Sequence, residues 1–114
     1  MATRESLPVA IVAESDDETR LLIKSLLEFL GFAVVEAHDG QEAFESAVSY
    51  QPDLILIELK LPVVTGFNAI RRIKKISDLN NVPIIAMSSR AAKTNEHLAL
   101  AAGCSAHVAK PIEF

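Results

Sequence analysis

The chain has 114 residues, half of them hydrophobic, and this length and composition predict one domain with one buried core. Its formal net charge is −4 and no run of Lys or Arg forms a basic tract, so direct binding of nucleic acid is not expected. No apolar stretch approaches the roughly 20 residues of a membrane span, which argues against a membrane protein.

The N-terminus and the cysteine content indicate a cytoplasmic protein. Residues 1–8 lack the apolar core of a signal peptide, and we expect them to be an extension that precedes the domain. The single Cys104 cannot form an internal disulfide, which fits a reducing compartment. Because Cys104 follows Gly103 in an apolar stretch, it is interpreted as a packed, inert thiol.

The first strand and helix are predicted by a short apolar run followed by helical spacing. Val9–Ala13 is rich in β-branched side chains, as in a buried strand. A helix over 18–30 follows, started by a capping box with Ser15 as N-cap and Glu18 as third helical residue. We expect the apolar face of this helix to consist of Leu22, Leu26, Phe29 and Leu30.

The middle of the chain repeats this alternation. Residues 32–37 predict a second strand, and Asp39 is expected to cap a helix that runs to about Tyr50. After Pro52, residues 53–58 predict a third strand, whose centre is apolar throughout, as in a strand covered on both faces.

The last part of the chain predicts two further helices and two further strands. Thr65 begins a third helix, which carries four basic residues outward: Arg71, Arg72, Lys74 and Lys75. This basic cluster is either a solvated helix face or a docking patch for an acidic partner. Strands are predicted over 82–87 and 106–109, with a helix over 91–102 between them.

Strands that alternate with helices predict an α/β fold, a doubly wound parallel sheet with right-handed crossovers. In such sheets, ligands bind outside the carboxyl ends of the strands. Four polar residues lie at or just after the ends of the first, third, fourth and fifth strands: Glu14, Glu58, Ser88 and Lys110. We therefore expect these side chains to converge.

Several stretches of the sequence resemble the receiver domain of two-component signalling, a response-regulator module, over residues 9–114. They are VAIVAESD from Val9, PDLILIELKLPVVTG from Pro52, PIIAMSS from Pro83 and AAGCSAHVAKP from Ala101. The resemblance implies a flavodoxin-like fold, a five-stranded parallel sheet of strand order 2-1-3-4-5. The family has a fifth helix after the last strand, and this chain stops at Phe114, so that helix is expected to be missing.

The resemblance also implies a role for each residue at the strand ends. In the family, an acidic pair after the first strand helps to hold Mg²⁺, and an Asp at the end of the third strand accepts a phosphoryl group from a histidine kinase. A hydroxyl and a lysine contact the phosphoryl oxygens, and an aromatic residue on the fifth strand reports the state to a partner. The matching positions here are, in that order, Glu14 with Ser15, Glu58, Ser88, Lys110 and His107.

Three departures from the family pattern weaken phosphoryl transfer. Glu58 is one methylene longer than Asp, and a misplacement of about 1 Å can cost about a hundredfold in rate. Ser15 removes one carboxylate of the kind that Mg²⁺ prefers, and Lys60 adds a nearby positive charge. No metal site is therefore expected beyond weak Mg²⁺ binding at Glu14 and Glu58. Asp53 is no substitute acceptor, because it begins the third strand at the opposite end of the sheet.

The sequence thus leads to the hypothesis of a phosphorylation-independent pseudo-receiver in a phosphorelay, a binding module and not an enzyme. Glu58 would supply a permanent negative charge held by Lys110 and Ser88. The expected partner is a protein: a histidine kinase, an output domain, another signalling protein or a second copy in a homodimer. The alternative is a conventional Mg²⁺-dependent phosphoacceptor response regulator. A nucleotide-binding domain is disfavoured because no glycine-rich loop follows the first strand.

Overall fold

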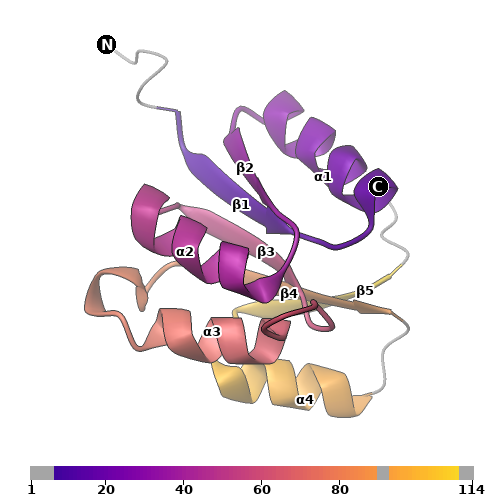
Figure 1. The fold of residues 1–114 in the computed structure, drawn as a ribbon, viewed down its shortest axis with the longest axis vertical. Helices are drawn as coiled ribbons and strands as arrows, with labels where there is room; N and C mark the ends of the chain where they lie inside the picture. The colour runs from indigo at the N-terminus through magenta and orange to yellow at the C-terminus, as the bar shows by residue number, and fades with distance from the viewer. Residues whose placement is uncertain (1–6, 90–92, 111–114) are drawn as a thin grey trace.

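The computed structural model describes residues 7–89 and 93–110, which form a five-stranded parallel sheet covered by helices (Figure 1). The strands are β1 (Val9–Ala13), β2 (Ala33–Ala37), β3 (Leu54–Glu58), β4 (Ile84–Ser89) and β5 (Ala106–Lys110). Their order across the sheet is β2-β1-β3-β4-β5, which confirms the predicted doubly wound, flavodoxin-like topology. The fourth strand lies two residues further along the chain than predicted.

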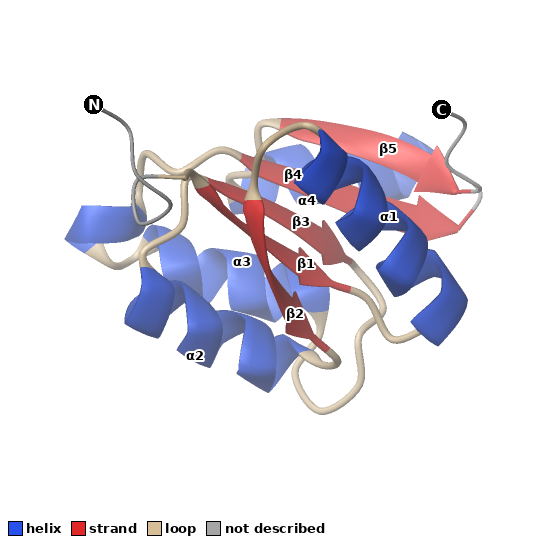
Figure 2. Cartoon of the chain, turned by 90° about the horizontal axis from the view of Figure 1, so that it is seen from above, coloured by secondary structure: helices blue, strands red, loops and turns tan. Residues whose placement is uncertain are grey.

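The described residues contain four α-helices. They are α1 (Asp17–Phe29), α2 (Gly40–Tyr50), α3 (Gly66–Lys74) and α4 (Lys93–Ala102), with a 3-10 turn at Ser77–Leu79. Figures 1 and 2 show α1 on one face of the sheet and α2, α3 and α4 on the other. The predicted start of the fourth helix at residue 91 lies outside the described residues. None of the helices that the structure describes is long and apolar enough to cross a membrane.

The core has two parts because the sheet buries side chains on both faces. Successive residues of a strand point to opposite faces, so in β1 Ile11 joins the cluster beneath α2, α3 and α4, whereas Val12 joins the cluster beneath α1. The larger cluster, under three helices, includes Cys104, which is 7% exposed. Burial raises the pKa of the Cys104 thiol, which supports its interpretation as an inert packed residue.

The predicted apolar face of α1 is wrong. The residues that α1 buries are Arg20, Ile23 and Leu27. Leu22 is 56% exposed and Phe29 is 87% exposed. The helix has leucines on more than one side, so both faces satisfy helical spacing, and only the position of α1 against β1 and β2 selects the Ile23 face.

Candidate functional site

The carboxyl ends of four strands meet at one edge of the sheet. The register pairs Ala13 of β1 with Ile57 of β3, so the next residues along the two strands, Glu14 and Glu58, are neighbours. On the other side of β3, Glu58 is paired with Met87 of β4, which places Ser88 one residue beyond. Lys110 is the last residue of β5. The sheet topology therefore gathers the polar residues that the sequence predicts to converge.

Lys110 joins the two carboxylates at this edge. Its Nζ donates to Glu14 Oε1 at 2.6 Å and to Glu58 Oε2 at 2.6 Å. Glu14 is fully buried, and the side chains of Glu58 and Lys110 are only 12% and 16% exposed. A charge removed from water needs such a partner, because an unpaired one is strongly destabilising. We name Glu14, Glu58 and Lys110 the strand-end triad.

Ser15 provides the remaining hydrogen bonds to Glu58. Both the backbone N–H and the hydroxyl of Ser15 donate to Glu58 Oε1, at 3.2 and 2.8 Å. The predicted role of Ser15 as helix N-cap is wrong: Asp16 caps α1 by accepting from the N–H of Thr19. The N–H of Asp16 in turn donates to Glu14 Oε2 at 3.0 Å. The turn between β1 and α1 thus directs its donors into the triad.

The pKa values of the two carboxylates in the triad move in opposite directions. Burial raises the pKa of Glu14, because loss of water disfavours its charged form, and the neighbouring Glu58 raises it further. The hydrogen bond from Lys110 lowers this pKa but only partly offsets the increase. Burial acts in the same direction on Glu58, but donation by Lys110 and Ser15 outweighs it and lowers the pKa. Burial by itself would lower the pKa of Lys110, but the hydrogen bonds to the two carboxylates outweigh it and raise this pKa. The surroundings of Glu58 therefore favour its charged form, whereas those of Glu14 disfavour it.

Ser88 and His107 form a separate pair beside the triad. Ser88 is 2% exposed, and its Oγ lies 2.6 Å from His107 Nε2 in a hydrogen bond. The expectation that Ser88 would hold the charge of Glu58 is not met, since the donors to Glu58 among the described residues are Ser15 and Lys110. Instead, the pairing of β4 with β5 places Ser88, the predicted phosphoryl-contact residue, next to His107, the predicted reporter residue.

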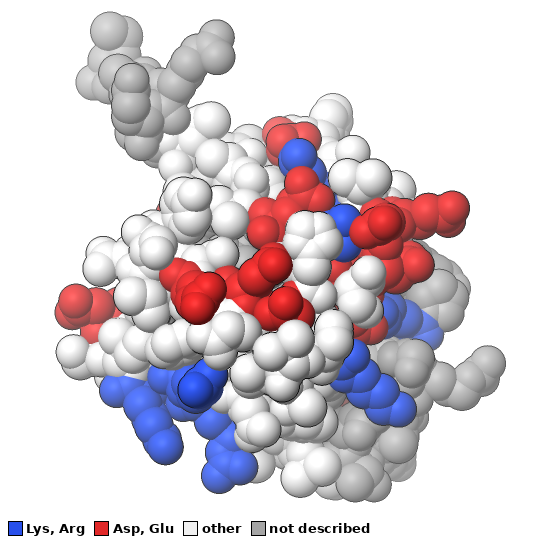
Figure 3. Space-filling model, viewed as in Figure 1, with Lys and Arg blue, Asp and Glu red and all other residues white. Residues whose placement is uncertain are grey.

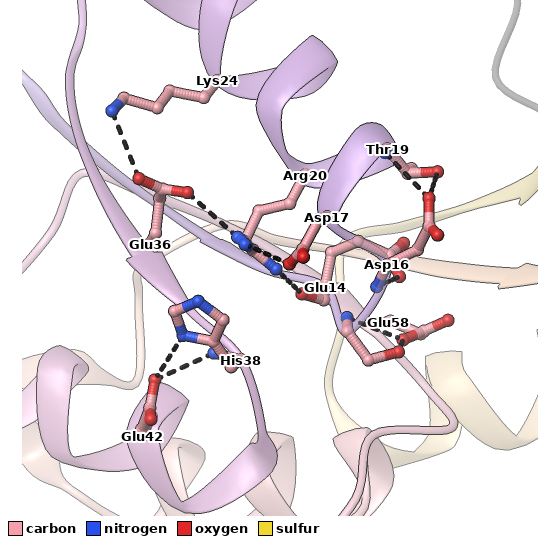
Figure 4. Close-up of polar contacts among 11 residues, drawn as sticks. Glu14, Asp16, Asp17, Thr19, Arg20, Lys24, Glu36, His38, Glu42 and Glu58 are labelled. Atoms are coloured by element: carbon pink, nitrogen blue, oxygen red, sulfur yellow. Dashed lines mark hydrogen bonds and ion pairs between the residues drawn. The ribbon is translucent and has the colours of Figure 1, made fainter.

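Arg20 is a site residue that the sequence interpretation missed. Its side chain is buried and donates to the backbone carbonyl of Glu14 at 3.0 Å, to Glu36 at 2.9 Å and to Asp17 at 2.6 Å (Figure 4). Arg20 therefore ties the end of β1 to β2 and to the first turn of α1. Its helical spacing with Ile23 and Leu27 would have revealed it only if the buried face of α1 had been chosen correctly.

The loop after β3 is held close to the triad. A Cβ added to Gly66 would lie 2.1 Å from the carbonyl oxygen of Glu58, so only glycine lets α3 begin this near the strand end. Lys60 is exposed in this loop, and the ion pairs that the described residues make with Glu14 and Glu58 come from Lys110. Asp53 accepts from the N–H of Val9 at 2.8 Å at the far end of the sheet, as expected.

The donor set of the triad does not fit a divalent cation as it is arranged. All four carboxylate oxygens of Glu14 and Glu58 already accept hydrogen bonds, two of them from the Lys110 ammonium. Magnesium requires near-octahedral oxygen ligands, so an ion bound by these carboxylates would have to compete with the donors that they already accept from. Within residues 7–89 and 93–110, no group of three or more Asp, Glu, His or Cys side chains is arranged to hold a metal.

The comparisons with known proteins agree with the fold. The sequence profile of the response regulator receiver domain family matches residues 10–114 of this chain. The chain belongs to the receiver domain family. It is 32% identical over 107 residues to the polar-differentiation response regulator DivK of Brucella anthropi, which covers 93% of this chain and 87% of that protein. Receiver domains are modules of two-component signalling.

Two solved receiver domains illustrate the family. That of the sensor histidine kinase PA1611 from Pseudomonas aeruginosa is 30% identical, with a TM-score of 0.86, over 95% of this chain and 88% of that one; its structure has a magnesium ion coordinated in the active site cleft. That of the Saccharomyces cerevisiae response regulator Ssk1, co-crystallised with the histidine phosphotransfer protein Ypd1, is 24% identical, with a TM-score of 0.84 over 94% of this chain and 82% of that one. The second similarity shows a shared fold.

Proposed function

We propose that this chain is a receiver module whose signalling state does not depend on phosphorylation and which acts through protein–protein contacts rather than as an enzyme. One observation carries the proposal: both carboxylate oxygens of Glu58, at the acceptor position of the family, accept hydrogen bonds from Ser15 and Lys110. The lowered pKa of Glu58 supports a permanent negative charge at this strand end.

The chemistry of phosphoryl transfer supports this assignment. An acceptor carboxylate must present an oxygen in line with the phosphorus atom, and transfer depends almost entirely on positioning and on charge stabilisation. The longer side chain of Glu58 instead reaches the ammonium of Lys110, and its side chain is only 12% exposed. A divalent cation would have to displace Lys110 from two carboxylates at once, so we expect magnesium to bind only weakly.

The proposal is tested by incubation with acetyl phosphate and Mg²⁺, followed by intact-mass measurement. The natural chain should gain no stable phosphoryl group. The double variant Glu58→Asp/Ser15→Asp, which shortens the acceptor and restores a second carboxylate, should gain one. Glu45→Asp is the matched control, because it shortens a carboxylate on the surface of α2 and should change nothing. Stoichiometric phosphorylation of Glu58 in the natural chain would contradict the proposal.

The contact to a partner is proposed to form on the α4–β5 face around His107. His107 is half-buried, and its bond to Ser88 links the outer surface of β5 to the strand-end edge of the sheet. A histidine kinase, an output domain or another signalling protein would bind there. Because Ser88 is the residue that His107 is hydrogen-bonded to, the coupling would depend on Ser88, and Ser88→Ala should alter binding at His107.

The second candidate is a conventional magnesium-dependent phosphoacceptor. It is favoured by the carboxylate that Glu58 retains at the acceptor position and by the 30% identity to a receiver domain with magnesium in its cleft. Calorimetric titration with Mg²⁺ separates the two candidates. Affinity in the millimolar range or weaker agrees with the first, whereas a micromolar site would require Lys110 to leave the carboxylates and would favour the second.

A further inference from the structure

An open groove runs along α3 and the loop that precedes this helix. It has a volume of about 480 Å³ and is lined by Val63, Val64, Asn68, Arg71, Arg72 and Lys75, among others. A second hollow of about 280 Å³ lies between α3 and α4, where Phe67 and Leu98 face it. Arg71 lines both, so the two hollows adjoin. We name the first one the α3 groove.

The cations of the α3 groove have no carboxylate partner within the part of the chain that the structure describes. Among the described residues, the ion pairs are made by Arg20, Lys24, His38 and Lys110, and none involves the three basic residues of the groove. Lys74 differs from them and from the prediction that it points outward, because its Nζ donates to the backbone carbonyls of Asn80 and Val82. Figure 3 shows Lys and Arg gathered below a band of Asp and Glu.

Arg72 is held in place by groups that leave its charge uncompensated. Its guanidinium carbon lies 5.2 Å from the centre of the Phe44 ring, and its Nη1 donates to Gln41 Oε1 at 3.0 Å. A guanidinium has five N–H donors, so most remain available to a bound carboxylate. The helix dipole explains why cations are favoured near the C-terminal end of α3. It does not explain why the Arg72 guanidinium is held between the Phe44 ring and the Gln41 amide.

The mouth of the groove carries an exposed apolar side chain. Val63 is 81% exposed and has a φ of 69°, a conformation that a β-branched residue rarely adopts. The N–H of Val64 donates to the carbonyl of Pro62 at 2.8 Å, which closes a tight γ-turn around Val63. The turn is packed against α2, since a Cβ on Gly40 would lie 1.7 Å from the Val64 carbonyl oxygen. The loop therefore holds a valine beside cations that form no ion pair with the described residues.

We propose that the α3 groove docks an acidic segment of a partner protein, with carboxylates bound by Arg71, Arg72 and Lys75 and one apolar side chain seated against Val63. The charge of the groove is complementary to carboxylates, and an Arg fork binds a carboxylate through two parallel hydrogen bonds. Nucleic acid fits less well, because the chain as a whole carries a net charge of −4 and would repel a phosphate backbone.

The test uses a fluorescent peptide of Asp and Glu with a single central Leu, measured by anisotropy against the 114-residue chain. We expect saturable binding in the micromolar to millimolar range, weakened about tenfold by Arg71→Glu, because reversing one charge replaces attraction with repulsion. Lys60→Glu is the matched control: it makes the same change in net charge outside the groove lining and should weaken binding about twofold or less. Lys75→Glu provides a second variant should Arg71→Glu fail to fold, as judged by circular dichroism.

Several outcomes would overturn the proposal. Absence of binding at millimolar peptide would do so, and so would an equal loss with Arg71→Glu and Lys60→Glu, which would show attraction to net charge only. Equal affinity for a peptide with Ser in place of Leu would remove the role of Val63. A single-stranded oligonucleotide that binds more tightly than the peptide, or self-association of the chain that Arg71→Glu abolishes, would assign the groove to a different occupant.

Discussion

The strand-end triad and the α3 groove hold charged side chains in opposite ways. In the triad, one ammonium lies 2.6 Å from each of two carboxylates, and all three side chains are buried or nearly so. In the groove, Arg71, Arg72 and Lys75 are exposed and make no ion pair with the described residues. The two regions lie in different parts of the same α/β domain, and both are built from residues that the sequence singles out as charged.

The difference separates charges that stabilise the fold from charges that are available to another molecule. A buried charge must be paired within the chain, because its desolvation costs several kcal/mol. An exposed charge costs little by itself and contributes little to stability. Substitutions in the triad should therefore alter folding, whereas substitutions in the groove should alter binding and leave folding almost unchanged.

The largest effect is expected from Lys110→Met. Removal of the ammonium leaves the buried Glu14 and Glu58 facing each other without a cation, so the free energy of unfolding should fall by about 3 kcal/mol in urea melts near neutral pH. Lys75→Met is the matched control, since it removes an exposed lysine next to α3 and should change stability by about 0.5 kcal/mol or less. Lys74 is unsuitable as the control because it binds backbone carbonyls. Equal effects of the two variants would end the distinction between triad and groove.

A smaller effect on the free energy of unfolding is expected from a change of pH, and its sign should differ between Glu14 and Glu58. The raised pKa of Glu14 gives a stabilising contribution that is fully present below its ordinary value of 4.5 and is lost as pH rises through the folded-state pKa. The lowered pKa of Glu58 gives one that is present above 4.5 and is lost as pH falls through the folded-state pKa. The two carboxylates therefore favour the folded state in different pH ranges.

Paired variants measure these contributions by urea unfolding between about pH 3 and pH 8. Relative to the natural chain, Glu14→Gln should become more favourable as pH rises, whereas Glu58→Gln should become less favourable. The pH dependence of each difference is the quantity of interest, since a constant offset reflects only the change of packing. Parallel curves for the two variants would show that the carboxylates titrate alike and would contradict the opposite pKa shifts of Glu14 and Glu58.

The smallest effect is expected from Arg72→Ala in the groove. The contacts of Arg72 with Phe44 and Gln41 lie at the surface, so their loss should lower the free energy of unfolding by about 0.5–1 kcal/mol. Arg71→Ala removes a neighbouring exposed guanidinium that lines the same groove without stacking on Phe44, so it should cost less and serves as the control. A loss as large as that of Lys110→Met would place Arg72 among the structural charges and would weaken the case for a docking role.

The amino-acid sequence determined the topology and the residues of the strand-end edge. Apolar runs such as Val9–Ala13 alternate with helical patterns, and this order permits few arrangements other than a doubly wound parallel sheet. Because the carboxyl ends of parallel strands share one edge, the positions of Glu14, Glu58 and Lys110 along the chain sufficed to predict that they meet. Local signals were also enough to predict Asp39 as the N-cap of α2 and to place the start of α3 at Thr65, which is its N-cap; each accepts from the N–H three residues ahead.

Only the tertiary structure decided which partner each of the other polar residues takes. Ser15 satisfies the local pattern of an N-cap, yet its hydroxyl donates to Glu58, 43 residues away, and Asp16 caps the helix instead. Ser88 and Arg20 likewise find His107 and Glu36 on neighbouring strands. Several partners lie within reach of one polar side chain, and their hydrogen bonds differ by little in energy. The packing of α1 and the register of the strands therefore make the choice, and neither is encoded in the few residues around the side chain concerned.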